Sequence, residues 1–177
     1  GGAEGDPTEV ALLEAAAARG MEKPALAELF PLLARLPFSA ERGMMTTLHK
    51  EGEGVIAFVK GAPERVLARC VRALDGEAVG PVDAAAVLTE VDAMAAEGLR
   101  VLAFGVRRFP SVPDPLTPED VERDLTFVGL AGLHDPARPE ARAAIEAIVL
   151  DSYAWFKDLV RSRRQMNDAQ LAAVADG

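Results

Sequence analysis

Apolar residues near the N-terminus recur at helical spacing between two residues that commonly bound helices. Asp6 is a candidate N-cap with Pro7 at the first helical position, and Gly20 can end the helix in a left-handed conformation. A second long helix is expected over residues 83–97, because its hydrophobic residues fall on one face. Two shorter helices are expected, one before Pro31 and one over residues 63–70.

Strand-like runs fill much of the remaining chain. Residues 44–48 and 55–59 flank a Glu-Gly-Glu-Gly turn and predict a hairpin, and a second turn is expected at residues 75–76. Two more strands are expected over residues 99–106 and 125–133, separated by a proline-rich loop that should be exposed and mobile. Helices and hairpins alternate without a regular βαβ order. The pattern therefore predicts an α+β fold, a mainly antiparallel sheet flanked by helices.

The C-terminal part differs from the rest in composition. From Pro139 the pattern becomes helical again, and Tyr153 and Trp155 stand near a basic cluster at residues 161–164. We therefore expect one domain over residues 1–140 and a helical tail over residues 141–177, through which the chain could self-associate.

Composition and charge narrow the classes of partner. With 177 residues, 50% hydrophobic, the chain is long enough for a packed core. Its net charge of −9 argues against binding nucleic acid. The longest uncharged apolar stretch, residues 125–133, is under half of the roughly 20 residues that span a bilayer, so no membrane insertion is expected. A single cysteine, Cys70, excludes an internal disulfide and fits a reducing, cytoplasmic setting.

No familiar catalytic pattern is visible in the residues alone. The chain has no metal-ligand spacing, nucleophile elbow, Walker-type loop or dinucleotide glycine fingerprint. His49 and His134 are isolated in sequence, and an exposed strand-end or loop position is the better interpretation of each. We assign no catalytic residue and no metal ligand.

Four short polar segments adjoin predicted strands and carry complementary chemistry. They cover residues 5–9, 37–42, 60–64 and 98–100. Together they offer an aromatic ring, a lysine beside a glycine and an arginine, which are the parts needed to stack a purine and neutralise phosphate. In this order and at these separations, the segments resemble the nucleotide-binding domain of cation-transporting P-type ATPases, nearest to bacterial and Golgi-type calcium pumps.

The resemblance covers residues of about 5–140 and implies a site for ATP or ADP, with Mg²⁺ accompanying the nucleotide, on the cytosolic face of a membrane pump. It implies that Phe38 stacks on adenine, that Lys60 lies at the mouth of the pocket and that Arg100 reaches the phosphates. The implied nucleotide-binding set is Thr8, Glu9, Phe38, Ser39, Arg42, Lys60, Gly61, Ala62, Arg100 and Leu102. Residues 133–140 resemble the hinge that returns to the phosphorylation domain.

Several of these side chains also have a plainer interpretation. A phenylalanine such as Phe38 is by default a core residue, and Lys60 could be a solvated strand end. Arg100 could be half of a surface ion pair, and Glu9 could belong to a capping box. Arg42 could be structural, bonding backbone or a carboxylate near the pocket.

The chain also departs from the family pattern. Gly43 stands where the family commonly has a lysine, so we expect nucleotide binding to be weaker by about 1 kcal/mol. The 177 residues contain no Asp-Lys-Thr-Gly-Thr phosphorylation motif and no metal-binding Gly-Asp-Gly-x-Asn-Asp motif. The chain is therefore expected to bind nucleotide without efficient turnover, as weak hydrolysis would need a base that the residues do not identify.

Two alternatives concern the tail and the pocket. Residues of about 149–177 resemble a fragment of a signal-peptide-peptidase-type serine protease, which predicts a fusion with its junction near Val149. Ser152 and Lys157 are nevertheless better interpreted as ordinary helix residues than as a catalytic pair. The alternative to a nucleotide-binding domain is a non-catalytic interaction or oligomerisation module with a decayed nucleotide pocket.

Overall fold

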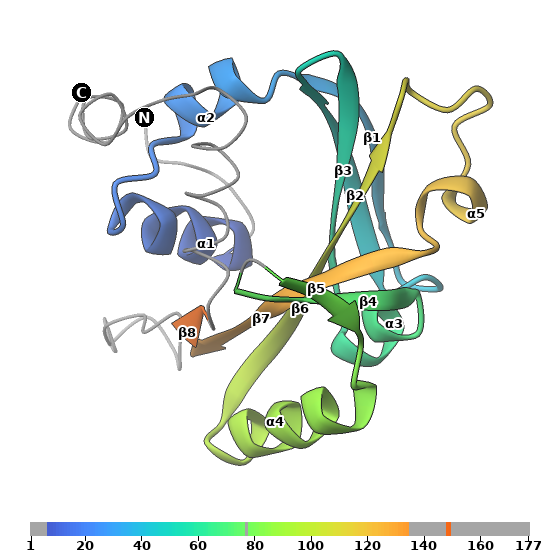
Figure 1. Ribbon diagram of the computed structural model, residues 1–177. Coiled ribbons are helices and arrows are strands. Elements are labelled where there is room, and N and C mark those ends of the chain that lie inside the picture. The colour runs from blue at the N-terminus through green and yellow to red at the C-terminus, as the bar shows by residue number, and fades with distance from the viewer. Residues whose placement is uncertain (1–6, 77, 135–147, 150–177) are drawn as a thin grey trace.

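A single sheet organises the chain in the computed structural model, which describes residues 7–76, 78–134 and 148–149 (Figure 1). Its strands lie in the order β1 (Leu32–Ser39), β2 (Met44–Glu51), β3 (Gly54–Gly61), β6 (Leu99–Phe109), β7 (Leu125–His134), β4 (Cys70–Asp75) and β5 (Ala78–Pro81). A two-residue strand, β8 (Ile148–Val149), pairs with β7. All neighbours are antiparallel except β4 and β7, which run parallel.

Alternation along the strands gives the sheet two different faces. The packed face carries fully buried side chains, among them Leu48, Val59 and Ala103. It is covered by α3 (Pro63–Leu67), α4 (Ala84–Ala96) and α5 (Pro118–Val121). The open face carries the neighbouring residues Phe58, Lys60 and Leu102, and it is approached by α1 (Pro7–Ala17) and α2 (Lys23–Leu29), the blue helices of Figure 1. Most of the apolar core therefore lies between the sheet and α3 to α5.

Local sequence signals account for the helix ends. Pro7 is the first helical residue of α1, as expected, whereas Asp6 lies outside the described residues. The side chain of Asp83 accepts a hydrogen bond from the backbone N–H of Ala86 at 3.0 Å and caps α4, which ends before Gly98 in the left-handed region (φ +81). The helix packs under β6, with Val91 and Met94 in the core.

The structure confirms the predicted fold class and corrects parts of the prediction. The helix expected over residues 63–70 ends at Leu67, because Cys70 already begins β4. The loop between β6 and α5 is not simply exposed, since Val112 and Leu116 pack against the core. Of the expected helical tail, the structure describes only Ile148–Val149, which form a strand. The hinge-like residues 135–140 and the rest of the tail lie outside the described residues.

Candidate functional site

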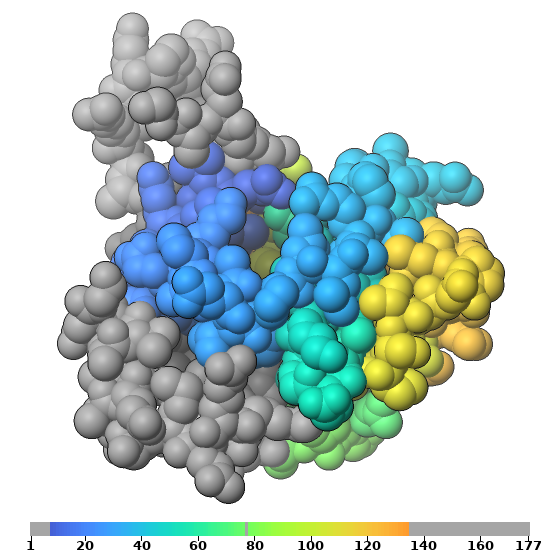
Figure 2. Space-filling view, turned by 90° about the horizontal axis from the view of Figure 1, so that it is seen from above, coloured from blue at the N-terminus to red at the C-terminus, as the bar shows by residue number. Residues whose placement is uncertain are grey.

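A cleft of about 320 Å³ opens on the open face, where α1 approaches the ends of β1, β3 and β6. In the space-filling view the surface is hollowed between the dark blue N-terminal helices and the lighter blue segment that follows them (Figure 2). Eight of the ten sequence-predicted site residues line the cleft. They are Thr8, Glu9, Phe38, Lys60, Gly61, Ala62, Arg100 and Leu102. Four segments that are distant in sequence are thus brought to one place.

Phe38 enters the cleft from the edge strand β1. Its side chain is 65% exposed, so the ring is not a core residue. An apolar ring at the rim of a cleft is a ready platform for a flat ligand, since an aromatic face gains from stacking when the ligand covers it. The core interpretation of Phe38 is therefore wrong.

Lys60 and Gly61 come from the end of β3. The Lys60 Nζ atom lies 3.1 Å from Glu9 Oε1 of α1, so this lysine is held in an ion pair across the cleft. Gly61 lacks a side chain for a packing reason: a Cβ there would lie 2.6 Å from Met44 Cβ on the adjacent strand β2. Strands β2 and β3 therefore approach closely where the cleft begins.

Arg100 and Leu102 line the cleft from the first half of β6. They lie two residues apart on one strand and so point to the same face, with Arg100 exposed and Leu102 partly buried. The cleft thus carries two cationic side chains, Lys60 and Arg100, near an exposed ring. A polyanion with a flat aromatic part fits this combination, because the cations attract its charge while the ring covers its apolar face.

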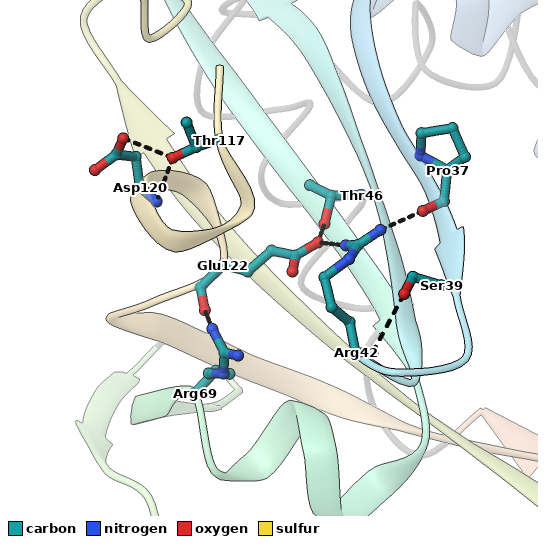
Figure 3. Close-up of polar contacts among 8 residues, drawn as sticks. All are labelled: Pro37, Ser39, Arg42, Thr46, Arg69, Thr117, Asp120 and Glu122. Atoms are coloured by element: carbon teal, nitrogen blue, oxygen red, sulfur yellow. Dashed lines mark hydrogen bonds and ion pairs between the residues drawn. The ribbon is translucent and has the colours of Figure 1, made fainter. Parts of the chain in front are cut away.

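Arg42 and Ser39 do not line the cleft, and the structure gives them the structural role that was the alternative for Arg42 (Figure 3). The Arg42 guanidinium donates to the fully buried carboxylate of Glu122 and to the backbone carbonyl of Pro37. Ser39 accepts hydrogen bonds from the backbone N–H groups of Arg42 and Gly43, at 3.5 Å to Oγ and 2.7 Å to the carbonyl oxygen. Both residues therefore shape the turn between β1 and β2.

Gly43, the departure from the family pattern, lies in this turn and lines the cleft. Its backbone is in the left-handed region (φ +69), and a Cβ there would lie 2.9 Å from Arg65 Cγ of α3. A side chain at this position would be strained, since L residues other than glycine seldom adopt this conformation. The turn as it stands is built for glycine.

Three lining residues were missed by the sequence analysis: Met45, Pro63 and Val101. Met45 could have been found, because it pairs with Lys60 across the β2–β3 ladder and alternation places it on the same face. His49 lies outside the cleft, and its Nδ1 is 2.8 Å from the carbonyl oxygen of Phe30, where α2 ends. His49 therefore anchors α2 to the sheet instead of occupying an exposed loop or strand end.

Neither metal-site nor membrane-spanning geometry is found in the described parts of the chain. Among residues 7–76, 78–134 and 148–149, no three His, Cys, Asp or Glu side chains are grouped so that they could hold a metal ion. Among the same residues, no helix is long and apolar enough to cross a bilayer.

The fold and the cleft define an α+β domain with an opening of small-molecule size. The sequence model of the P-type ATPase cytoplasmic domain N matches residues 2–140. The chain therefore belongs to this family of N domains, as the sequence motifs indicated.

Cation-transporting ATPases of several organisms are similar to this chain. The cation-transporting ATPase pma1 of Synechocystis shares 42% identity over 145 residues, which is 81% of this chain and 16% of the relative. The probable cation-transporting ATPase F of Mycobacterium tuberculosis shares 38% over 144 residues, again 81% and 16%. The calcium-transporting ATPase 1 of Bacillus cereus shares 35% over 144 residues, or 80% and 16%. The chain thus spans about a sixth of the length of these relatives.

The family match ends at residue 140, before the expected tail. The interpretation of residues 149–177 as a protease fragment, and of the chain as a fusion, receives no support from these matches and stays a prediction. The same holds for self-association through the tail, whose residues 150–177 lie outside the described part of the structure.

Proposed function

We propose that the cleft binds ATP or ADP, with the purine stacked on Phe38 and the phosphates near Lys60 and Arg100. The observation that carries this proposal is the meeting of an exposed ring and two cations in one cleft of about 320 Å³. That volume lies within the range of about 300–1,000 Å³ that is typical of small-molecule sites. Thr8, Glu9 and Leu102 then surround the base.

The lining at the end of β3 supports this arrangement. Gly61 contributes only backbone to the cleft and Ala62 contributes a small side chain, which fits a flat ring beside Lys60. The Lys60 ammonium can exchange its exposed partner Glu9 for ligand atoms at little cost, because an exposed ion pair contributes under about 1 kcal/mol. Mg²⁺ enters this proposal as the counter-ion of the nucleotide, with its ligands on the phosphates.

We propose further that the chain is the nucleotide-holding part of a cation-transporting pump on the cytoplasmic side, and that it holds nucleotide without turning it over efficiently. The match to the family of N domains and the similarity to cation-transporting ATPases support this role. Relatives named for calcium and for sodium and potassium match at 35% and 33% identity. These similar values do not distinguish one ion from another, so calcium stays a prediction.

Calorimetric titration of the 177-residue chain with ATP and with ADP tests the site. Replacing Phe38 and Lys60 together by alanine should weaken binding by about tenfold or more, since base stacking alone is worth about 1–3 kcal/mol. A matched control replaces Leu33, exposed on β1, and Lys50, exposed on β2, neither of which lines the cleft. Equal affinities for the two double variants would reject the site.

A further inference from the structure

Glu122 is a buried carboxylate that the cleft does not use. It lies between α5 and β7 with no exposed surface. Its Oε1 atom accepts hydrogen bonds from Thr46 Oγ1 at 2.7 Å and from the Arg42 guanidinium. Its Oε2 atom is buried and accepts no hydrogen bond from the residues that the structure describes. Burying a carboxylate is costly unless a cation pairs with it. The cation here is Arg42, and the pair in turn fixes the position of the Arg42 side chain.

Phe38 lies near the end of β1, just before the turn that Arg42 holds. In the β1–β2 ladder Leu36 pairs with Thr46 and Ser39 pairs with Met44, so the register shifts between these two pairs. The shift falls at Pro37 and Phe38, where the ladder does not set the backbone. Pro37 also has no N–H to donate.

The ring of Phe38 is not held by packing either, because most of its surface is exposed. What fixes the backbone at this point is the Arg42 guanidinium, which donates to the Pro37 carbonyl one residue before the ring and to Glu122 at the same time (Figure 3). The guanidinium therefore replaces the missing ladder contact, and Glu122 is its anchor.

We propose that Glu122 is a positioning residue for the nucleotide site: through Arg42 it holds the interrupted end of β1 so that the Phe38 ring is preset for stacking. The carboxylate acts from the packed face and does not touch the ligand. A preset ring loses less conformational freedom when the ligand binds, so the network raises affinity without adding a contact. This inference rests on the proposed function, since it assumes that Phe38 is the stacking platform.

A double-mutant cycle on ATP affinity tests the proposal with Glu122→Gln and Phe38→Ala in the full chain. Glutamine keeps the shape of the side chain and removes its charge. We expect Glu122→Gln to weaken ATP binding by about five- to tenfold with Phe38 present, and by less than about twofold in the Phe38→Ala background. An equal loss in both backgrounds would show that the effect does not pass through the ring and would overturn the proposal.

Arg42→Lys gives a second route to the same answer. A lysine can pair with Glu122, but its single ammonium group does not reproduce the fork that reaches Glu122 and Pro37 together. It should lower affinity in the same ring-dependent way as Glu122→Gln. If both variants unfold at 25 °C, the network serves the stability of the fold and the proposal is wrong.

The matched control is Glu51→Gln, which weakens another carboxylate–arginine pair of the same sheet. Glu51 lies at the far end of β2 and accepts from Arg108 at 2.8 and 3.1 Å, away from the cleft. The affinity of the Glu51→Gln variant for ATP should equal that of the parent chain. If the parent chain does not bind ATP, or if Phe38→Ala alone leaves the affinity unchanged, the proposed function itself fails. If the parent chain binds ATP and Phe38→Ala weakens that binding, but Glu122→Gln binds ATP as the parent does, only the positioning role fails.

Discussion

The two faces of the sheet each hold an ion pair, and the two pairs have opposite settings. On the open face, Lys60 and Glu9 meet at 3.1 Å with the Glu9 side chain 49% exposed. On the packed face, Arg42 meets Glu122, which is fully buried and also accepts from Thr46. The Lys60–Glu9 pair can exchange its partners with water, whereas the Arg42–Glu122 pair is fixed, because water can replace a partner only where water reaches.

This difference suits the proposed nucleotide site, whose side chains must stay accessible while the backbone that carries them stays in place. Phe38 and Arg100 of the cleft are exposed, whereas the carboxylate of Glu122 is fully buried beside β2 and α5. Rigid support on one face and loosely held side chains on the other give a cleft that is formed before the ligand arrives. Four predictions test whether the two faces differ as described.

The largest effect is expected when the buried pair is broken outright. Glu122→Ala leaves the Arg42 guanidinium and the Thr46 hydroxyl without their shared acceptor, so the free energy of unfolding should fall by about 3 kcal/mol. Urea unfolding followed by circular dichroism measures this change. Glu51→Ala is the control and should cost less, because its partner Arg108 is 39% exposed and regains water, although the Glu51 side chain is itself only 8% exposed. Equal losses would remove the contrast between the faces.

The close approach of β2 and β3 at the cleft should be the next most sensitive feature. In Gly61→Ala the new methyl group would lie 2.6 Å from Met44 Cβ and 2.8 Å from Met44 Cα, and backbone must move to accommodate it. We expect a loss of about 2 kcal/mol in unfolding free energy. Gly80→Ala on the edge strand β5 is the control, because a Cβ there meets nothing within 4 Å. A Gly61 variant as stable as the Gly80 variant would contradict the steric explanation.

More of the structure of the open face than of the packed face could be predicted from the sequence. The hairpin of β2 and β3 and the four polar segments at the cleft are local patterns, in which neighbouring residues carry the signal. The pair of Arg42 and Glu122 is not local, since 80 positions separate the two residues. A glutamate in a charged stretch before β7 reads as a surface residue, and only the packing of α5 against β2 and β3 makes it a buried one.

Long-range pairing also explains why the sequence did not predict strands β4 and β5. The first strand of the β4–β5 hairpin lies beside β7 in parallel, and the register of such a pair is set by the whole fold instead of by a turn. The end of the helix at Leu67 follows from the same contact, because the backbone N–H of Leu125 donates to the carbonyl oxygen of Arg69 at 2.9 Å and draws the chain into the sheet. No local sequence pattern predicts this hydrogen bond.

The buried thiol of Cys70, on the packed face, should make the free energy of unfolding depend on pH. Burial raises the pKa of Cys70 from an ordinary 9.0 to about 12, and its Sγ donates to the Val66 carbonyl oxygen at 3.2 Å. As pH rises above 9 the unfolded thiol loses its proton while the folded thiol keeps it, so the unfolding free energy falls between pH 9 and 12. At pH 10 this amounts to about 1 kcal/mol.

The comparison that isolates the thiol is with Cys70→Ala, which has no proton to lose. The stability advantage of the parent chain over this variant should shrink by about 1 kcal/mol from pH 8 to pH 10, measured by urea unfolding. Iodoacetamide at pH 8 should modify the folded chain far more slowly than the chain in urea, because the thiolate is the reactive form. Rapid modification of the folded chain would mean that the packed face opens readily.

The smallest effect is expected at the exposed pair. Glu9→Gln removes the charge that holds Lys60, yet the unfolding free energy should change by less than about 0.5 kcal/mol, because Lys60 regains water when it loses its partner. The small change should become smaller still in 0.5 M salt, since screening already weakens an exposed pair. Thermal unfolding of the variant and the parent at both salt concentrations measures it. A loss near that of Glu122→Ala would mean that Glu9 and Lys60 are locked together, and a locked lysine could not turn from its carboxylate to the phosphates of a nucleotide.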